Sequence, residues 1–185
     1  QINTVQSKNL PFEDIFKTLF TGVIGGVESW QVLLADYRAH ADDEKYEATP
    51  GAVAAVNWLN RHGILVGLVT NRVKMAEERL LQAGFTLDQF ICICSPASPE
   101  LKKPHPQSLD AALAVFKVKG ISPSELVLFG DHSDDYYPAF YNGLKFVAIM
   151  KGMFQRSCFL ELGLLDNLII FYLTHIETAL ATAGT

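Results

Sequence analysis

The stretch LVLFGDHSDD, residues 126–135, decides the fold, because an apolar run typical of a buried strand leads directly into a Gly-Asp pair. In an open parallel sheet, ligands collect just beyond the carboxyl ends of the strands, so a carboxylate placed there faces the ligand crevice. Asp131 follows the strand at once, and Asp135 comes four residues later. Magnesium takes hard oxygen ligands and is often held by one or two carboxylates completed by substrate phosphate. We therefore expect Asp131, with Asp135, to hold Mg²⁺.

A simpler interpretation of this stretch stays open. Acidic residues commonly start turns and occupy the first turn of a helix, where they accept hydrogen bonds from free backbone N–H groups. On that interpretation, Asp131 starts a turn and Asp135 caps the helix that follows.

A second strand is expected over residues 64–70, and it ends at a hydroxyl group, that of Thr70, with Asn71 next. If a helix begins at Asn71, its free backbone N–H groups and the hydroxyl together form a site for an anion. Thr70 and Asn71 are thus candidate substrate-binding residues. The alternative is that the pair forms an ordinary helix N-cap.

A third polar element is LKKPHP, residues 101–106, in which two prolines stiffen the backbone near Lys103 ahead of the next expected helix. An ammonium group held in place is a good partner for phosphoryl oxygens. We expect Lys103 to bind substrate, whereas a solvated loop lysine is the default for any single residue of this kind.

The order of elements after Pro50 predicts the fold class. Short apolar runs alternate with amphipathic stretches, as in right-handed βαβ units around a parallel sheet. The fold is expected to be α/β, a Rossmann-like three-layer α/β/α parallel sheet. Strands are expected over 64–70, 90–95, 126–130, 145–149 and 168–171, and helices near 51–62, 72–83, 107–118 and 134–142.

The first fifty residues follow a different pattern, with two amphipathic helical segments and no strand between them. One apolar stripe comprises Phe12, Ile15, Phe16, Leu19 and Phe20, and the other comprises Trp30, Leu33, Leu34 and Tyr37. We expect a short helical cap insertion within residues 1–49 and the α/β core over residues 50–185.

Composition narrows the class of partner. The net charge is −5, and the basic residues form no stripe that could follow a nucleic-acid backbone or an anionic membrane surface. The three cysteines lack metal-ligand spacing, and the run FICIC places two of them in an apolar strand. We expect inert thiols, a cytoplasmic setting, a small-molecule substrate, no nucleic-acid or membrane partner, and a monomer or homodimer.

The ordered set of Thr70, Lys103, Gly130-Asp131 and Asp135 resembles the second, third and fourth motifs of the haloacid dehalogenase superfamily. The resemblance covers nearly all of residues 50–180. Within the superfamily, this stretch looks like the phosphoglycolate phosphatase-like branch. It implies a Mg²⁺-dependent phosphatase that acts on a small phosphorylated metabolite through an aspartyl-phosphate.

The resemblance also implies roles for the residues that match. Thr70 and Lys103 would be catalytic residues: Thr70 would bind the transferring phosphoryl group, and Lys103 would neutralise charge on the nucleophile and the phosphate. Asp131 would hold the metal with help from Asp135. Splitting hydrolysis into two displacements requires a positioned carboxylate, and the metal and the lysine offset the repulsion between two anions.

The first motif of that superfamily, a strand ending in Asp-x-Asp-x-Thr, is missing or degenerate in this sequence. If Thr4 and Ser7 match its threonine and serine, Ile2 stands where the second aspartate belongs, and the nucleophile falls just before Gln1. The strand that carries this motif lies in the middle of the family's sheet, so a cleft is expected between the strands ending at Thr70 and Asp131. A catalytically inactive binding or scaffold protein with the same fold is the alternative function.

Overall fold

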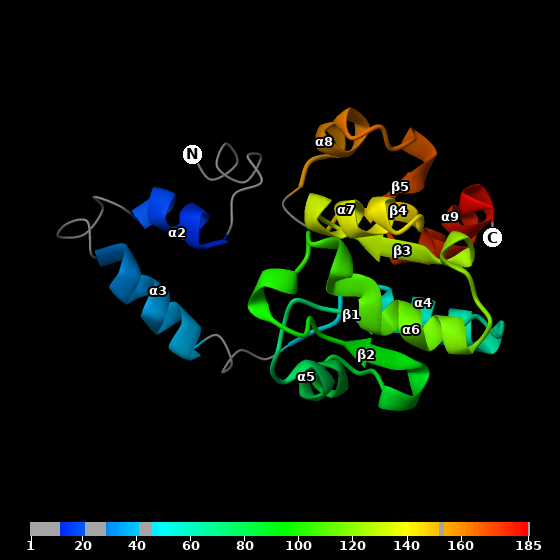
Figure 1. Cartoon of the computed structure of the whole chain (residues 1–185), viewed down its shortest axis with the longest axis horizontal. Coiled ribbons are helices and arrows are strands. Elements are labelled where there is room, and N and C mark those ends of the chain that lie inside the picture. The colour runs from blue at the N-terminus through cyan, green and yellow to red at the C-terminus, as the bar shows by residue number, and fades with distance from the viewer. Residues whose placement is uncertain (1–11, 21–28, 41–45, 152–153, 185) are drawn as a thin grey trace.

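The computed structural model describes residues 12–20, 29–40, 46–151 and 154–184 (Figure 1). Its helices are α2 (Phe12–Phe20), α3 (Ser29–His40), α4 (Ala52–Arg61), α5 (Ala76–Gln82), α6 (Asp110–Val118), α7 (Ser133–Tyr141), α8 (Arg156–Glu161) and α9 (Ile176–Ala183). Short 3₁₀ helices are η1 (Leu87–Gln89), η2 (Pro99–Leu101), η3 (Pro106–Leu109), η4 (Pro123–Glu125), η5 (Asp166–Leu168) and η6 (Leu173–His175). The strands are β1 (Gly67–Val69), β2 (Cys92–Cys94), β3 (Val127–Gly130), β4 (Lys145–Ile149) and β5 (Ile169–Ile170).

The described strands form two separate parallel sheets, β1-β2 and β3-β4-β5. Gly67 pairs with Cys92 in the first sheet, and Gly130 pairs with Ala148 in the second. No backbone pairing joins β1 to β3 among the described residues. The cleft expected between the strands that end at Thr70 and Asp131 stays a prediction.

Alternation along the strands separates two layers of helices. Side chains of a strand point to opposite faces in turn. Leu128, Phe146 and Ala148 pack with α7 and α8 in one cluster, whereas Val127 and Phe129 pack with α4 and α9 on the other side. Val66, next to β1, joins the cluster of α4 and α9, so this helix layer spans both sheets. The α/β/α arrangement expected from the sequence is confirmed.

The helix expected over 72–83 starts only at Ala76, and this boundary prediction is wrong. Met75 adopts a left-handed backbone conformation, with φ 58°, which ends any helical path through the preceding residues. Gly84, which follows α5, has a positive φ of 88°, as is common for the glycine just after a helix. The helices α8 and α9 were not predicted. The strand β4 has the expected bounds, whereas the other four described strands are shorter than expected.

The helices α2 and α3 lie side by side (Figure 1). In α3, Trp30 and Leu34 are buried as the apolar stripe predicts, while Tyr37 is 48% exposed and lies outside it. The side chains of Phe12, Ile15 and Phe16 and the possible first-motif residues 1–7 lie outside the described residues. The division into a cap within 1–49 and a core over 50–185 stays a prediction.

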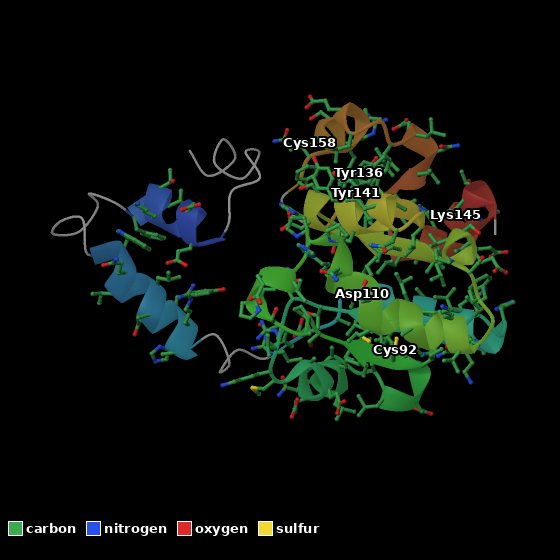
Figure 2. The ribbon with its side chains drawn as sticks, in the orientation of Figure 1. Cys92, Asp110, Tyr136, Tyr141, Lys145 and Cys158 are labelled. Carbon is green, nitrogen blue, oxygen red and sulfur yellow. The ribbon has the colours of Figure 1, made fainter. Side chains whose placement is uncertain are left out.

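All three cysteines are free and half-buried. Desolvation, followed by the charge of Cys94, raises the pKa of Cys92 to about 12, so its thiol stays protonated at neutral pH. Cys158 lies on α8, far from Cys92 in Figure 2. The expected inert character of the strand thiols fits these surroundings.

None of the helices in the described ranges is long and apolar enough to cross a bilayer.

Candidate active site

The structure brings together residues from three connections that follow strands. Thr70 and Asn71 follow β1, Lys103 lies in the connection between β2 and α6, and Asp131 follows β3. Parallel strands carry their carboxyl ends to the same edge, which is where ligands bind in α/β domains. The fold therefore brings these residues to the same region, as predicted.

The central contact of the site is an ion pair between Lys103 and Asp135. The Lys103 Nζ lies 2.5 Å from Asp135 Oδ1, and the two side chains are only 15% and 12% exposed. The same ammonium donates a hydrogen bond to the carbonyl oxygen of Val69, the last residue of β1, at 3.3 Å. Lys103 thus joins the end of β1 to the first turn of α7, the helix that follows β3.

Gly130 is required by the position of Asp135. The Asp135 side chain folds back over the end of β3, and a Cβ added at Gly130 would lie 2.3 Å from Asp135 Cβ and 2.7 Å from its Oδ2. The backbone N–H of Asp131 donates to that Oδ2 at 3.3 Å. The N-cap of α7 is His132, whose ring nitrogen accepts from the N–H of Asp134, so Asp135 lies in the first turn of the helix and not at its N-cap.

Asn71 holds Lys103 in place. Its side-chain oxygen accepts from the backbone N–H of Lys103 at 2.7 Å, and its amide nitrogen donates to the Lys103 carbonyl at 3.0 Å. Both ends of the Asn71 amide are thereby occupied, and the arrangement supports a positioning role. Its predicted contact with substrate stays a prediction.

Thr70 and Asn71 do not start a helix, because α5 begins at Ala76. The expectation of helix N-terminal amides at this point, and the alternative of an ordinary helix cap, are both wrong. The Thr70 hydroxyl instead accepts the backbone N–H of Arg72 at 3.1 Å, and the hydroxyl of Ser95 donates to the Arg72 carbonyl at 2.6 Å. This network fixes the loop while leaving the Thr70 hydroxyl proton available to a ligand oxygen.

Asp131 has the electrostatic character of a cation ligand. Desolvation, followed by the negative charge of Asp135, raises its pKa above the usual range, although the residue keeps contact with solvent. A bound cation would relieve this repulsion. Within the described ranges no group of three or more metal-ligating side chains is present. Carboxylate oxygens such as those of Asp131 and Asp135 are ligands that magnesium takes when water or phosphate completes its coordination.

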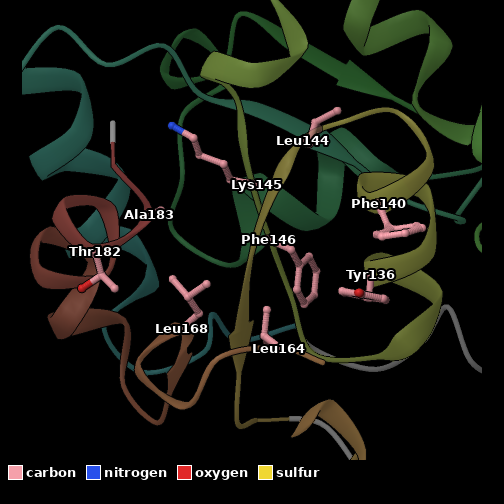
Figure 3. A pocket seen from close by; sticks show the side chains of 9 residues that line it. All are labelled: Tyr136, Phe140, Leu144, Lys145, Phe146, Leu164, Leu168, Thr182 and Ala183. Atoms are coloured by element: carbon pink, nitrogen blue, oxygen red, sulfur yellow. The ribbon is translucent and has the colours of Figure 1, made fainter. Parts of the chain in front are cut away.

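Two hollows differ in their relation to this site. An open pocket of about 590 Å³ is lined by Thr70, Asn71, Arg72, Val73, Lys74 and Lys102. The other, of about 220 Å³, is mostly apolar and includes Lys145, the first residue of β4 (Figure 3). It therefore lies at the opposite end of the strands from the carboxylates. The polar pocket is the one that belongs to the site.

Three basic residues of the polar pocket were missed by the sequence analysis. Arg72 and Lys74 flank Val73 in a segment predicted to be helical, and Lys102 directly precedes Lys103. Their proximity in sequence to Asn71 and Lys103 was the available signal.

The fold and site define a parallel α/β domain in which a lysine, a hydroxyl group and two carboxylates meet at the carboxyl ends of the strands. The sequence pattern of the haloacid dehalogenase-like hydrolases matches residues 3–149. The chain belongs to this family.

Individual relatives agree with this assignment. The chain is 30% identical over 130 residues to phosphoglycolate phosphatase 1 of Pseudomonas aeruginosa, an alignment that covers 70% of the chain and 47% of that protein. It is 30% identical over 129 residues to pyrophosphatase PpaX of Bacillus cereus, covering 68% and 58%. The chain thus spans about half the length of the curated relatives it matches.

A solved structure supports the fold independently. A haloacid dehalogenase-like hydrolase from Streptococcus pneumoniae superimposes with a TM-score of 0.72 over 95% of this chain and 79% of that one, at 16% identity.

Replacing Gly130 by Ala should displace Asp135 and break its ion pair with Lys103. We expect a loss of about 3 kcal/mol in the free energy of unfolding, because an overpacked contact is added to an uncompensated buried charge. Denaturant titration measures it. Gly67→Ala, also in a strand, is the matched control: its Cβ would approach Cys92 Sγ and the Phe116 ring at 3.0 Å, and we expect a loss of about 1 kcal/mol. Equal stability of the two variants would contradict the role given to Gly130.

Replacing Asp131 by Asn should weaken Mg²⁺ binding by about tenfold or more. The raised pKa means that the folded state binds the Asp131 proton more tightly than the unfolded state does. In the metal-free protein this group therefore favours the folded state below its unfolded pKa, and the contribution is lost as the pH rises through the folded pKa. Metal-free Asp131→Asn should consequently melt at a higher temperature than the parent at neutral pH.

Thermal scans with and without Mg²⁺, across a pH series, measure both effects. Mg²⁺ should stabilise the parent less as the pH falls through the raised pKa of Asp131, because the ligand must be deprotonated. Asp88→Asn, which changes an exposed carboxylate in η1, is the control and should keep the full Mg²⁺ effect. If the Asp131→Asn variant keeps the full stabilisation by Mg²⁺, Asp131 is not a ligand.

Proposed function

We propose that the protein is a Mg²⁺-dependent phosphatase that hydrolyses a small phosphorylated metabolite. The observation that carries the proposal is the buried contact of Lys103 with Asp135, placed between the Thr70 loop and Asp131. A cation and two acids at one sheet edge can bind a phosphoryl group and a metal ion together. Membership of a hydrolase family and similarity to two phosphatases support the same reaction class.

Each residue has a definite part in this proposal. The Thr70 hydroxyl and the Lys103 ammonium bind the oxygens of the transferring phosphoryl group. Asn71 holds the backbone of Lys103 in position through its two hydrogen bonds. Asp131 and Asp135 hold Mg²⁺, which would neutralise charge on the phosphate as the transition state forms.

The proposed route passes through an aspartyl-phosphate, as the family resemblance implies. The nucleophile is not among the residues that the structure describes. Asp14 and Asp36 lie within α2 and α3, away from any strand end, and are not candidates for it.

A non-catalytic binding or scaffold protein is the second candidate function. The specific observation in its favour is Ile2, which stands at the position of the family's second aspartate if Thr4 and Ser7 match the motif. Loss of a general acid–base group commonly lowers the rate by a factor of about 10² to 10⁴.

The proposal includes a reducing, cytoplasmic setting, which the three free thiols support. It also includes a monomer or homodimer with no nucleic-acid or membrane partner.

Phosphate release by the full chain, measured across a panel of small phosphorylated metabolites with and without Mg²⁺, tests the proposal. We expect Mg²⁺-dependent release that falls by about 10² or more in Thr70→Val and in Lys103→Met, since both remove groups aimed at the developing charge. Lys119→Met, which removes an exposed lysine just after α6, is the matched control and should keep full activity.

The outcomes separate the two candidate functions. A trapped beryllofluoride adduct would exclude the binding protein. Binding of Mg²⁺ and phosphate without release would favour it. Absence of both binding and release would overturn the assignment of the site itself.

A further inference from the structure

The pocket beside Thr70 carries an unbalanced positive charge. Arg72, Lys74 and Lys102 line it together with Thr70, Asn71 and Val73, and none of these lining residues is acidic. Its volume of about 590 Å³ falls within the range of about 300–1,000 Å³ typical of small-molecule sites. The pocket therefore has room for more than the phosphoryl group that Thr70 would contact.

The loop that carries two of these cations is held in an unusual conformation. Met75 is the one non-glycine residue with positive φ in the described ranges, and its left-handed backbone keeps residues 71–75 out of α5. Such strain has a free-energy cost of about 1–3 kcal/mol and is found preferentially at functional sites. Here it places Arg72 and Lys74 around the pocket instead of along a helix.

Arg72 already has a protein partner. Its guanidinium donates to the Tyr46 hydroxyl at 3.1 Å, and Tyr46 also stacks against Arg79, whose guanidinium carbon lies 3.6 Å from the ring centroid. Arg72 is thereby anchored and contributes its charge to the pocket from a fixed position.

The two lysines differ from Arg72. Lys74 and Lys102 are exposed, and neither makes an ion pair with an acidic side chain in the described part of the chain. Lys103, next to Lys102, is engaged instead with Asp135, and its side chain is only 15% exposed. The adjacent lysines thus have separate tasks, one within the candidate active site and one at the rim of the pocket.

We propose that Lys74 and Lys102 bind a second anionic group of the substrate, a carboxylate or a second phosphate, while its phosphoryl group contacts Thr70. This inference rests on the proposed function and narrows the substrate class to small metabolites with two anionic groups. Two charge-assisted contacts at the rim favour such substrates over phosphomonoesters with a neutral remainder.

Calorimetric titration of the full chain in Mg²⁺ with three phosphonates tests the inference without requiring turnover. Methylphosphonate offers one anionic group, phosphonoacetate adds a carboxylate, and methylenediphosphonate adds a second phosphonate. We expect at least one of the two latter probes to bind about five- to tenfold more tightly than methylphosphonate, as two exposed ion pairs allow. The tighter of the two identifies the second group as carboxylate or phosphate.

Variants assign the preference to the two lysines. In Lys74→Met/Lys102→Met the ratio of affinities should fall to about two or less, which also controls for Mg²⁺ chelation by the probes. Lys117→Met/Lys119→Met, which removes two exposed lysines at the end of α6, should keep the parent ratio. If the parent binds all three probes equally, or if the Lys74/Lys102 variant keeps the preference, the second-anion site is refuted while the proposed function stands. If no probe binds, and Thr70→Val leaves phosphate release unchanged, the second-anion site and the proposed function fail together.

Discussion

The ion pair between Lys103 and Asp135 is the interaction on which the rest of the site depends. The β1-β2 and β3-β4-β5 sheets are not joined by backbone pairing among the described strands. Lys103 bridges them through Asp135 near the start of α7 and the carbonyl of Val69 at the end of β1. A buried pair of this kind is held against a large desolvation penalty, so each partner is destabilising without the other. The same contact therefore orders the fold at this edge and sets the charge of the site.

Crowding at the end of β3 explains the Gly-Asp sequence. The Asp135 side chain that contacts Lys103 folds back over position 130, where an added Cβ would overlap it. This brings the Asp135 charge close to Asp131, whose pKa rises in consequence of both desolvation and that charge. Two acids held near each other destabilise the metal-free protein and are well suited to a cation. The glycine, the lysine and the two aspartates thus form one physical unit.

Local pattern predicted much of this arrangement. Apolar runs located β3 and β4 closely, and the rule that ligands collect at the carboxyl ends of strands brought Thr70, Lys103 and Asp131 to one edge. Other features depend on contacts between residues distant in sequence, which periodicity does not encode. Asn71 clamps the backbone of a residue thirty-two positions away, and the left-handed Met75 ends a helical pattern that is otherwise favourable. The six residues of α8 are too few to show a helical period, and the helix is held by Phe159, which is fully buried.

A double-mutant cycle on the Lys103–Asp135 pair tests the central claim most directly. The free energy of unfolding is measured at neutral pH for the parent, Lys103→Met, Asp135→Asn and the double variant. We predict a loss of about 3 kcal/mol for each single change and a coupling energy of about 2 kcal/mol, because the double variant leaves no unpaired buried charge. Single losses that add within about 0.5 kcal/mol would show that the two residues act independently and would contradict the account.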